Sequence, residues 1–236
     1  MKKYIGTKQI EAEPMTRGDA WGKHLLREKP STENFDDEGY HVRYEDGYES
    51  WSPKDVFEKA YKIAETPVDR MQIEAEEVNG RYVKLAAFID SGKMDEVVND
   101  MYNKCLLEMQ CCTMFDYIRL LDTRIQRMQG SDSAEVRKMN FGMAIMALKA
   151  GFPIRRSGWN GKGLMVFKQV PAHIDSDIIP KMQSIPQSAK DLILKGKGFI
   201  DYTSQCLIYN ENTGRADSWV PSISDVFADD WEIVLS

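Results

Sequence analysis

Two apolar seams in the middle of the chain constrain its fold more than any other feature. In each seam, apolar residues recur at alternating steps of four and three, which is the period of a helix that packs along one face. The first seam comprises Met71, Ala75, Val78, Tyr82, Leu85 and Ile89, and the second comprises Leu107, Cys111, Met114, Ile118, Leu121, Ile125 and Met128. Because neither helix can bury its seam alone in water, the pattern predicts an antiparallel helical hairpin that oligomerises.

Short signals mark the ends of these helices. Thr66-Pro67-Val68-Asp69 is a helix-start signature, and Ser91-Gly92-Lys93 interrupts the first seam. We expect a short helix from Met94 to about Asn103 between the two long ones. The predicted hairpin domain covers residues 66–129, and residues 130–138 are a predicted polar linker.

A glycine-rich stretch near the C-terminus has the residue types of a nucleotide-binding loop. It lies between predicted strands at Ile154–Ser157 and Leu164–Gln169. Glycine lets the backbone approach a ligand closely, and successive amides in such a turn can bind an anion. Trp159 offers a flat face for stacking, and Asn160 offers a donor and an acceptor. Positive charge comes from Arg155, Arg156 and Lys162. The alternative is an ordinary hairpin loop whose tryptophan caps the core.

The sequence around this loop predicts an α+β domain with an antiparallel sheet over residues 139–236. Asn140 is the expected N-cap of a helix of about ten residues that Gly151 ends. The remaining expected elements are a helix near Ser188–Leu194, strands at Phe199–Tyr202 and Gln205–Tyr209, a strand ending at Trp219, a short helix at Ser222–Phe227 and a last strand at Trp231–Leu235.

Three stretches of this domain, at 140–151, 154–167 and 217–234, resemble in their order the second family of phage Thoeris anti-defence proteins. Members of that family are signal sponges that bind cyclic ADP-ribose-type messengers and, in some cases, cyclic dinucleotides. An extra segment at about 172–200 departs from the compact family pattern. The resemblance implies base stacking by Trp159 and Trp219 and phosphate contact by Arg156. The implied ligand-binding residues are Trp159, Asn160, Gly161, Arg156, Met165, Trp219, Ser222, Ser224 and Asp225.

The helical segment is similar to a second kind of sponge. Tyr82–Ile89, Leu107–Gln110 and Tyr117–Ile125 resemble the helical anti-CBASS proteins of phage, which sequester cyclic di- and trinucleotides between protomers. The resemblance covers about residues 66–129. The polar or aromatic groups expected near a ligand there are Tyr82, Lys84, Tyr117 and Arg124.

Residues 1–65 are predicted to form a small mixed module to which we assign no chemistry. A strand pair or one bent strand is expected over Lys3–Glu13, and Asp46-Gly47 predicts a β-hairpin turn. A helix is expected to follow, with Ser52 as N-cap and Pro53 at its first position, and to run to about Ala64.

Composition and charge exclude several functions. The net charge is −6, and residues 139–236 hold ten basic and ten acidic residues, so the whole excess lies in the first 138. A chain with no basic stripe is a poor binder of DNA or RNA polymers. No apolar run reaches the length of about 20 residues that crosses a bilayer, and no signal peptide is evident, so we expect a cytoplasmic protein. The four cysteines are interpreted as reduced thiols.

No catalytic constellation and no metal-ligand spacing is found in the sequence, and no cofactor is expected. We therefore predict a non-enzymatic phage sponge that captures cyclic nucleotide messengers in the host cytoplasm as a homo-oligomer, such as a tetramer or hexamer. The alternative is an oligomeric adaptor that binds a protein partner. A third hypothesis is a nucleotide hydrolase with an unusual site.

Overall fold

The computed structural model describes residues 9–235. It is built from helices and antiparallel sheets, which confirms the predicted α+β class. The chain divides into two compact units, Met1–Glu76 and Glu77–Ser236, which are described separately. Among the described residues, none of the helices combines the length and the apolar character needed to span a membrane.

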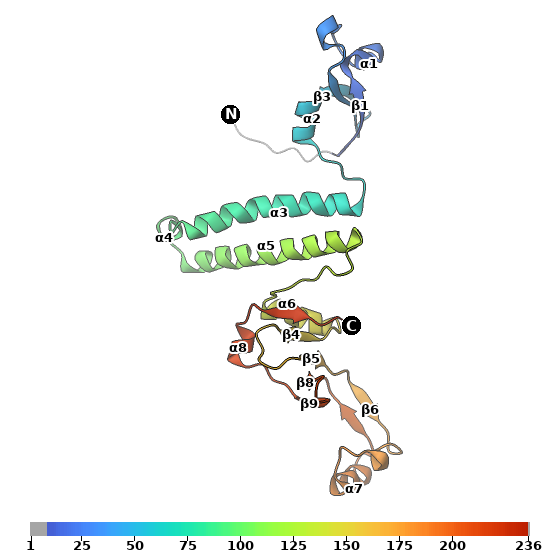
Figure 1. The fold of residues 1–236 in the computed structure, drawn as a ribbon, viewed down its shortest axis with the longest axis vertical. Coiled ribbons are helices and arrows are strands. Elements are labelled where there is room, and N and C mark those ends of the chain that lie inside the picture. The colour runs from blue at the N-terminus through green and yellow to red at the C-terminus, as the bar shows by residue number, and fades with distance from the viewer. Residues whose placement is uncertain (1–8, 236) are drawn as a thin grey trace. The chain divides into compact units, whose positions relative to one another are not determined.

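The first unit, whose strands β1 and β3 are labelled in Figure 1, contains a three-stranded antiparallel sheet in the order β1-β2-β3. The strands are β1 (Ile10–Thr16), β2 (Glu38–Tyr44) and β3 (Glu49–Pro53), and the accompanying helices are α1 (Arg17–Gly22), the 3-10 turn η1 (Thr32–Asn34) and α2 (Lys54–Ala60). The predicted turn at Asp46-Gly47 is confirmed, because the Tyr44 amide donates to the Tyr48 carbonyl at 2.9 Å. Residues 3–8 of the first expected strand segment lie outside the described residues.

The predicted start and end of the helix after β3 are wrong. β3 runs through Pro53, with Ser52 paired to Tyr40, so Ser52 belongs to the sheet and Pro53 occupies the N-cap position. The helix ends at Ala60 rather than near Ala64. Tyr61 is extended (φ −130°, ψ 147°), and its ring lies 5.0 Å from that of Phe57. The chain therefore leaves the helix at Tyr61, whose ring packs against Phe57, and the turn expected over residues 61–64 does not form.

The long helices begin largely where the sequence predicts. In α3 (Pro67–Asp90), the Asp69 amide donates to the Thr66 hydroxyl at 3.1 Å, which forms the expected N-cap. The short helix α4 (Met94–Val97) is briefer than predicted. The reason is that Asp100 caps α5 (Met101–Met128) by accepting from the Tyr102 and Asn103 amides, so the chain must leave α4 first.

The seams face inward, but they are only partly covered. Met71, Ala75, Leu121 and Ile125 are buried, whereas Met128 is 54% exposed. From Glu77 onward α3 lies antiparallel to α5, and the Tyr82 and Phe115 rings are 5.6 Å apart (Figure 1). Large apolar side chains that remain exposed on these helices include Val83, Leu106, Met109, Phe115 and Leu120.

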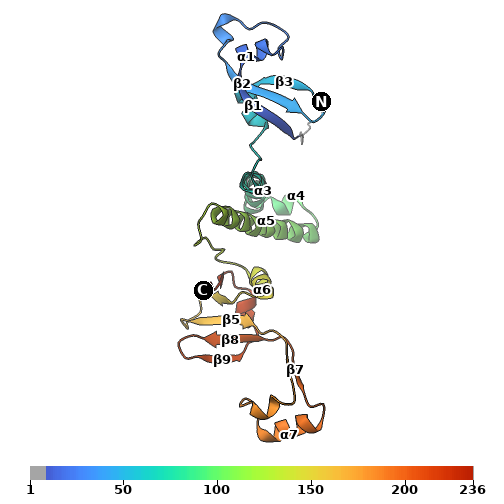
Figure 2. The same cartoon turned by 90° about the vertical axis from the view of Figure 1, so that its right-hand side faces the viewer.

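The rest of the second unit is built around a five-stranded antiparallel sheet in the order β10-β4-β5-β8-β9. Figure 2 shows β5, β8 and β9 of this sheet side by side. Its strands are β4 (Ile154–Arg156), β5 (Leu164–Lys168), β8 (Cys206–Asn210), β9 (Arg215–Ser218) and β10 (Trp231–Ile233), and its helices are α6 (Phe141–Lys149) and α8 (Ile223–Val226). Asn140 caps α6 as predicted, and its side-chain amide also donates to Asp116 of α5. The core contains Ala144, Leu148, Ile154, Val166 and Trp231.

The extra segment forms an arm with its own two-stranded sheet. β6 (Ala172–Ile174) pairs with β7 (Ile200–Tyr202), and between them lie the 3-10 turn η2 (Ile179–Lys181) and α7 (Gln187–Lys195) (Figure 2). The helix was predicted, whereas β6 was not. The arm leaves from the ends of β5 and β8, so the insertion leaves the pairing of those strands intact.

Candidate ligand-binding site

The glycine-rich loop is a tight connection between β4 and β5 rather than an open anion nest. Its end is fixed by the Asn212 side-chain amide, which donates to the Lys162 carbonyl at 2.6 Å. Gly163 takes a positive φ of 79°, and a side chain there would collide with Glu211 and Asn212. The amide of Gly158 is already bound to the Asp230 carboxylate at 2.8 Å. The anion that this loop holds is therefore an internal carboxylate.

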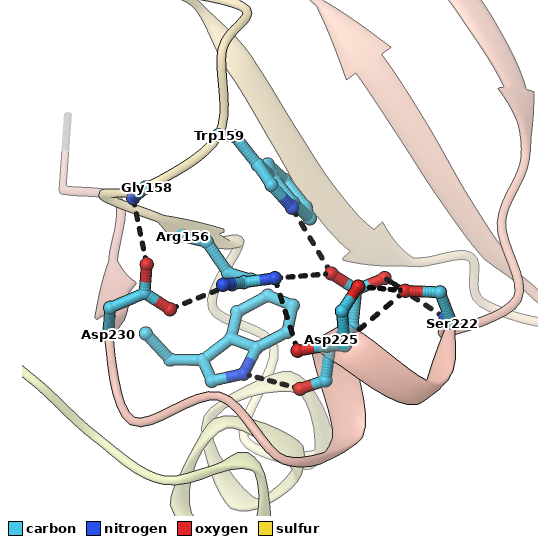
Figure 3. A network of polar contacts seen from close by, with 8 residues as sticks. Arg156, Gly158, Trp159, Ser222, Asp225 and Asp230 are labelled. Carbon is cyan, nitrogen blue, oxygen red and sulfur yellow. Dashed lines mark hydrogen bonds and ion pairs between the residues drawn. The ribbon is translucent and has the colours of Figure 1, made fainter.

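Asp225 is the centre of a polar network beneath the loop (Figure 3). One carboxylate oxygen accepts from Arg156 Nη1 at 3.0 Å and from Trp159 Nε1 at 3.2 Å. The other accepts from the amide and the hydroxyl of Ser222, which forms a capping box at the start of α8. A carboxylate has about four acceptor positions, and this network occupies them.

Burial would raise the pKa of Asp225, which is only 8% exposed. Hydrogen bonds from Ser222, Arg156 and Trp159 outweigh that effect and lower the pKa of Asp225 below its ordinary value. The carboxylate is therefore ionised at neutral pH. Because its acceptor positions are filled, it is poorly placed to act as a general base.

Arg156 joins the two ends of the domain. Besides Asp225, its guanidinium donates from Nε to Asp230 at 2.7 Å and from Nη1 to the Ser224 carbonyl at 3.2 Å (Figure 3). Burial of Asp230 raises its pKa, but hydrogen bonds from Arg156 and from the Gly158 amide more than compensate, so the pKa of Asp230 is lowered overall. These pairs hold the β4–β5 loop against α8 and the start of β10.

Two tryptophans, Trp159 and Trp219, each pack edge to face against a third, Trp231, beside this network. Trp231 is fully buried, and its Nε1 donates to the Asp225 carbonyl at 3.1 Å. Trp159 lies 5.4 Å from Trp231 at 77°, and Trp219 lies 6.1 Å away at 80°. Edge-to-face rings at these distances attract one another. Both outer indoles are half-buried, so each is partly a core residue and partly surface.

The structure brings most of the predicted C-terminal site residues together. Trp159, Arg156 and Asp225 share direct hydrogen bonds, and Ser222 and Ser224 hydroxyls lie 2.8 Å apart at the start of α8. Asn160 is exposed beside Trp159, and Gly161 follows it in the loop. Trp219 joins through Trp231.

Met165 is the exception. It neighbours Val166, which is buried in the core with Trp231. Alternate residues of a strand point to opposite faces of the sheet, so the Met165 side chain is on the face away from the tryptophans. The structure therefore does not bring Met165 to the network.

The four residues of the second predicted site are not gathered in one place. Tyr82 packs against Phe115 and is half-buried. Lys84 is two residues further along α3, about 200° around the helix, and is exposed. Tyr117 and Arg124 are both exposed on one stripe of α5, roughly 10 Å apart along its axis. The four side chains therefore do not converge on one pocket within a single protomer.

Two participants in the network were missed by sequence reasoning. Neither Asp230 nor Trp231 is among the predicted site residues, and Trp231 is expected only as the start of the last strand. What brings both residues to the network is the pairing of β4 with β10, in which Trp231 lies opposite Arg156. That pairing joins residues far apart in sequence, so local periodicity does not reveal it. Within residues 9–235, no group of three His, Cys, Asp or Glu side chains is placed to hold a metal ion.

The fold and the network thus define a small antiparallel α+β domain with a tryptophan-lined polar surface. Residues 139–234 match the Thoeris anti-defense 2-like domain. Over 102 residues the chain is 33% identical to Thoeris anti-defense 2 of Bacillus phage SP01. The matched region covers 41% of this chain and 96% of that protein. Residues 65–127 match the Sequestin family. The chain belongs to the Thoeris anti-defense 2-like family and carries a Sequestin-like helical segment before that domain.

Proposed function

We propose that this protein is a phage anti-defence sponge that binds cyclic nucleotide immune messengers and holds them without cleaving them. Both matched families are anti-defence proteins that sequester cyclic nucleotides. The observation that carries the proposal is the surface made by Trp159, Trp219 and the start of α8 over a fully paired Asp225. Because its polar groups are already hydrogen-bonded to one another, such a surface would need little reordering when a ligand binds, which lowers the entropic cost of binding.

The C-terminal domain is the proposed site for cyclic ADP-ribose-type messengers. Trp159 and Trp219 would stack against a base, and stacking contributes about 1–3 kcal/mol per base. Asn160 and the hydroxyls of Ser222 and Ser224 would hydrogen-bond base or ribose. Because the guanidinium of Arg156 is paired with two carboxylates, we propose that it positions the loop and Asp225 rather than reaching a phosphate itself.

The helical segment is the proposed site for cyclic di- and trinucleotides. The exposed cations Lys84 and Arg124 would face phosphates, and Tyr82 and Tyr117 would lie against bases. Because helical geometry separates these residues, a second protomer would complete the site. The exposed apolar side chains on α3 and α5 support oligomerisation, and a tetramer or hexamer is the proposed assembly.

The proposed activity is capture rather than catalysis. The carboxylates nearest the tryptophans, Asp225 and Asp230, are hydrogen-bonded and ionised, and the hydroxyl that reaches Asp225, from Ser222, is engaged in the capping box of α8. Capture in the cytoplasm of the infected host would deprive the defence system of its messenger.

A protein-binding adaptor is the second candidate. Val220, Ile223 and Phe227, on and around α8, are each 80–81% exposed. Apolar side chains this exposed, and this close in sequence, are typical of a surface that contacts another chain. In the sponge proposal the other chain is a second protomer, whereas in the adaptor alternative it is a different protein.

One experiment separates these functions. The purified protein is incubated with a panel of cyclic ADP-ribose isomers and cyclic oligonucleotides, filtered to remove free ligand and denatured by heat. The released small molecules are then identified by mass spectrometry. Intact messenger supports the sponge, altered messenger would indicate a hydrolase, and the absence of any bound messenger would favour the adaptor.

A further inference from the structure

A hollow lies near the closed end of the helical hairpin, where α4 connects α3 to α5 (Figure 1). Its volume is about 620 Å³, and its lining comes from residues 97–100, at and after the end of α4, and from the start of α5. A cavity of this size is large enough for a small organic group. The residues expected from the sequence to lie near a ligand of the helical segment do not belong to this lining.

The walls of the hollow are aliphatic. Val97 and Val98 line it from the end of α4, and Leu106 and Leu107 line it from α5. Val97 is 66% exposed and Leu106 is 41% exposed, so this apolar surface is in contact with solvent. A flat apolar group that covered it would be held by the hydrophobic effect.

Three side-chain amides lie among these aliphatic groups. They belong to Asn99, Asn103 and Gln110. Of the residues that the structure describes, none forms a hydrogen bond with these three side-chain amides. Each amide therefore has both donors and an acceptor to offer a ligand.

The hollow has little charge. Asp100 is the only ionisable residue of its lining. The two Asp100 carboxylate oxygens accept from the backbone amides of Tyr102 and Asn103, at 3.2 and 3.1 Å, and so cap α5. Lys104 lies outside the lining and pairs with Asp95 at 2.6 Å. The lining thus offers no cation to a phosphate, and it suits an uncharged group with a polar edge.

Two of the amides continue the stripe of α5 that carries Tyr117 and Arg124. Asn103, Gln110, Tyr117 and Arg124 follow one another at intervals of seven residues. Residues at this interval stay on one side of a helix and lie about 10.5 Å apart along its axis. The hollow is therefore one end of a stripe that passes from amides to a phenol and then to a cation.

We propose that this hollow holds one base of a captured cyclic oligonucleotide and that it selects adenine. The inference rests on the proposed function of the helical segment and names the base that this segment recognises. A side-chain amide pairs with the N6 and N7 atoms of adenine, because one is a donor and the other an acceptor. Guanine presents two acceptors at the same edge, which suit arginine or lysine. A hollow with amides and no cation therefore prefers adenine.

Calorimetric titration of the full-length protein with cyclic di-AMP and with cyclic di-GMP tests this specificity. The test variant is Asn103→Ala with Gln110→Ala, which removes two amides from the hollow. The matched control is Asn79→Ala with Gln126→Ala, which removes the same groups from exposed helical positions outside the lining. Light scattering checks that each variant keeps the oligomeric state of the unmodified protein.

We expect the unmodified protein to bind cyclic di-AMP about tenfold more tightly than cyclic di-GMP. The test variant should lose about tenfold in affinity for cyclic di-AMP and most of the preference, whereas the control should stay within about twofold. Asn103→Arg should shift the ratio of the two affinities toward cyclic di-GMP, because arginine pairs with the guanine edge.

Two failures can be told apart. If the unmodified protein binds neither cyclic dinucleotide, the proposed function of the helical segment fails, and this inference fails with it. If the protein binds them with equal affinity, or if the test and control variants behave alike, the inference alone is overturned and the bases lie elsewhere.

Discussion

The C-terminal domain and the helical segment reach a binding surface in opposite ways. In the C-terminal domain, Arg156, Asp225 and Asp230 are paired with one another, and the two outer indoles rest on Trp231. In the helical segment, Lys84 and Arg124 are exposed cations, and Tyr117 is exposed beside a partly covered seam. The first surface is organised within one chain, whereas we propose that the second is completed by another chain. The comparison shows that residues of the types that bind a ligand can be brought together by the fold of one chain, as in the C-terminal domain, or can lie apart in it, as in the helical segment.

The largest expected effect concerns the paired network. Asp225→Ala would leave Arg156, the Trp159 Nε1–H and the Ser222 amide without an acceptor, and breaking a buried pair costs about 3–5 kcal/mol. Arg124→Glu changes an exposed residue and should alter stability by no more than about 0.5 kcal/mol. Urea denaturation of both variants measures the contrast. Equal stability losses would remove the distinction between the two regions.

Trp159→Ala should have the next largest effect. Loss of stacking should weaken binding of cyclic ADP-ribose isomers by about 1–3 kcal/mol, or roughly ten- to a hundredfold. Because Trp159 also packs on Trp231 and bonds to Asp225, some stability should be lost with it. Calorimetry at a temperature well below the unfolding transition separates the two effects. Unchanged affinity would make Trp159 a core residue alone.

The two regions should be separable by exposed substitutions. Asn160→Ala should weaken binding of cyclic ADP-ribose isomers about tenfold, the loss of one well-placed hydrogen bond, and spare cyclic oligonucleotides. Arg124→Glu should do the reverse. Lys168→Ala and Lys59→Glu are the matched controls, because both side chains are exposed and lie outside the proposed sites. Light scattering on each variant checks that the oligomer is retained. If either test substitution abolished both activities in an intact oligomer, the ligands would share one pocket.

The smallest effect is the pH dependence that Asp225 and Asp230 give to the stability of the C-terminal domain. The pKa values of Asp225 and Asp230 lie below the ordinary value of 3.8. Their stabilisation is therefore complete above that value and is lost as the pH falls through the lowered folded-state pKa values. Urea midpoints measured from pH 7 to pH 3 should fall more steeply for the unmodified protein than for Asp230→Asn. Parallel curves would contradict this assignment.

Sequence patterns predicted the elements well wherever the signal is local. The seams gave both long helices, and Asn140, Ser222 and the Asp46-Gly47 turn occupy their expected structural positions. Local signals failed where two of them competed. Ser52 is a residue type that favours the N-cap position, but it lies in β3 and pairs with Tyr40 of β2. Asp100, a true N-cap, was missed within a continuous helical pattern.

The candidate site was predictable in its residues but not in their roles. Trp159, Ser222 and Asp225 were named from motifs, and they lie together. The pairing of Arg156 with Asp230 depends on β4 lying beside β10, a contact between residues 74 positions apart. No local pattern encodes that neighbour, so Arg156 was assigned to a phosphate when its structural partners are two carboxylates.

Sequential calorimetric titration tests the central claim most directly. The unmodified protein is saturated with a cyclic ADP-ribose isomer and then titrated with a cyclic trinucleotide, and the order is then reversed. Two separate regions predict that the second ligand binds with the stoichiometry and affinity it shows alone, and that both ligands are recovered intact. If the first ligand prevented the second from binding, both messengers would occupy one site and the division between the two regions would be contradicted.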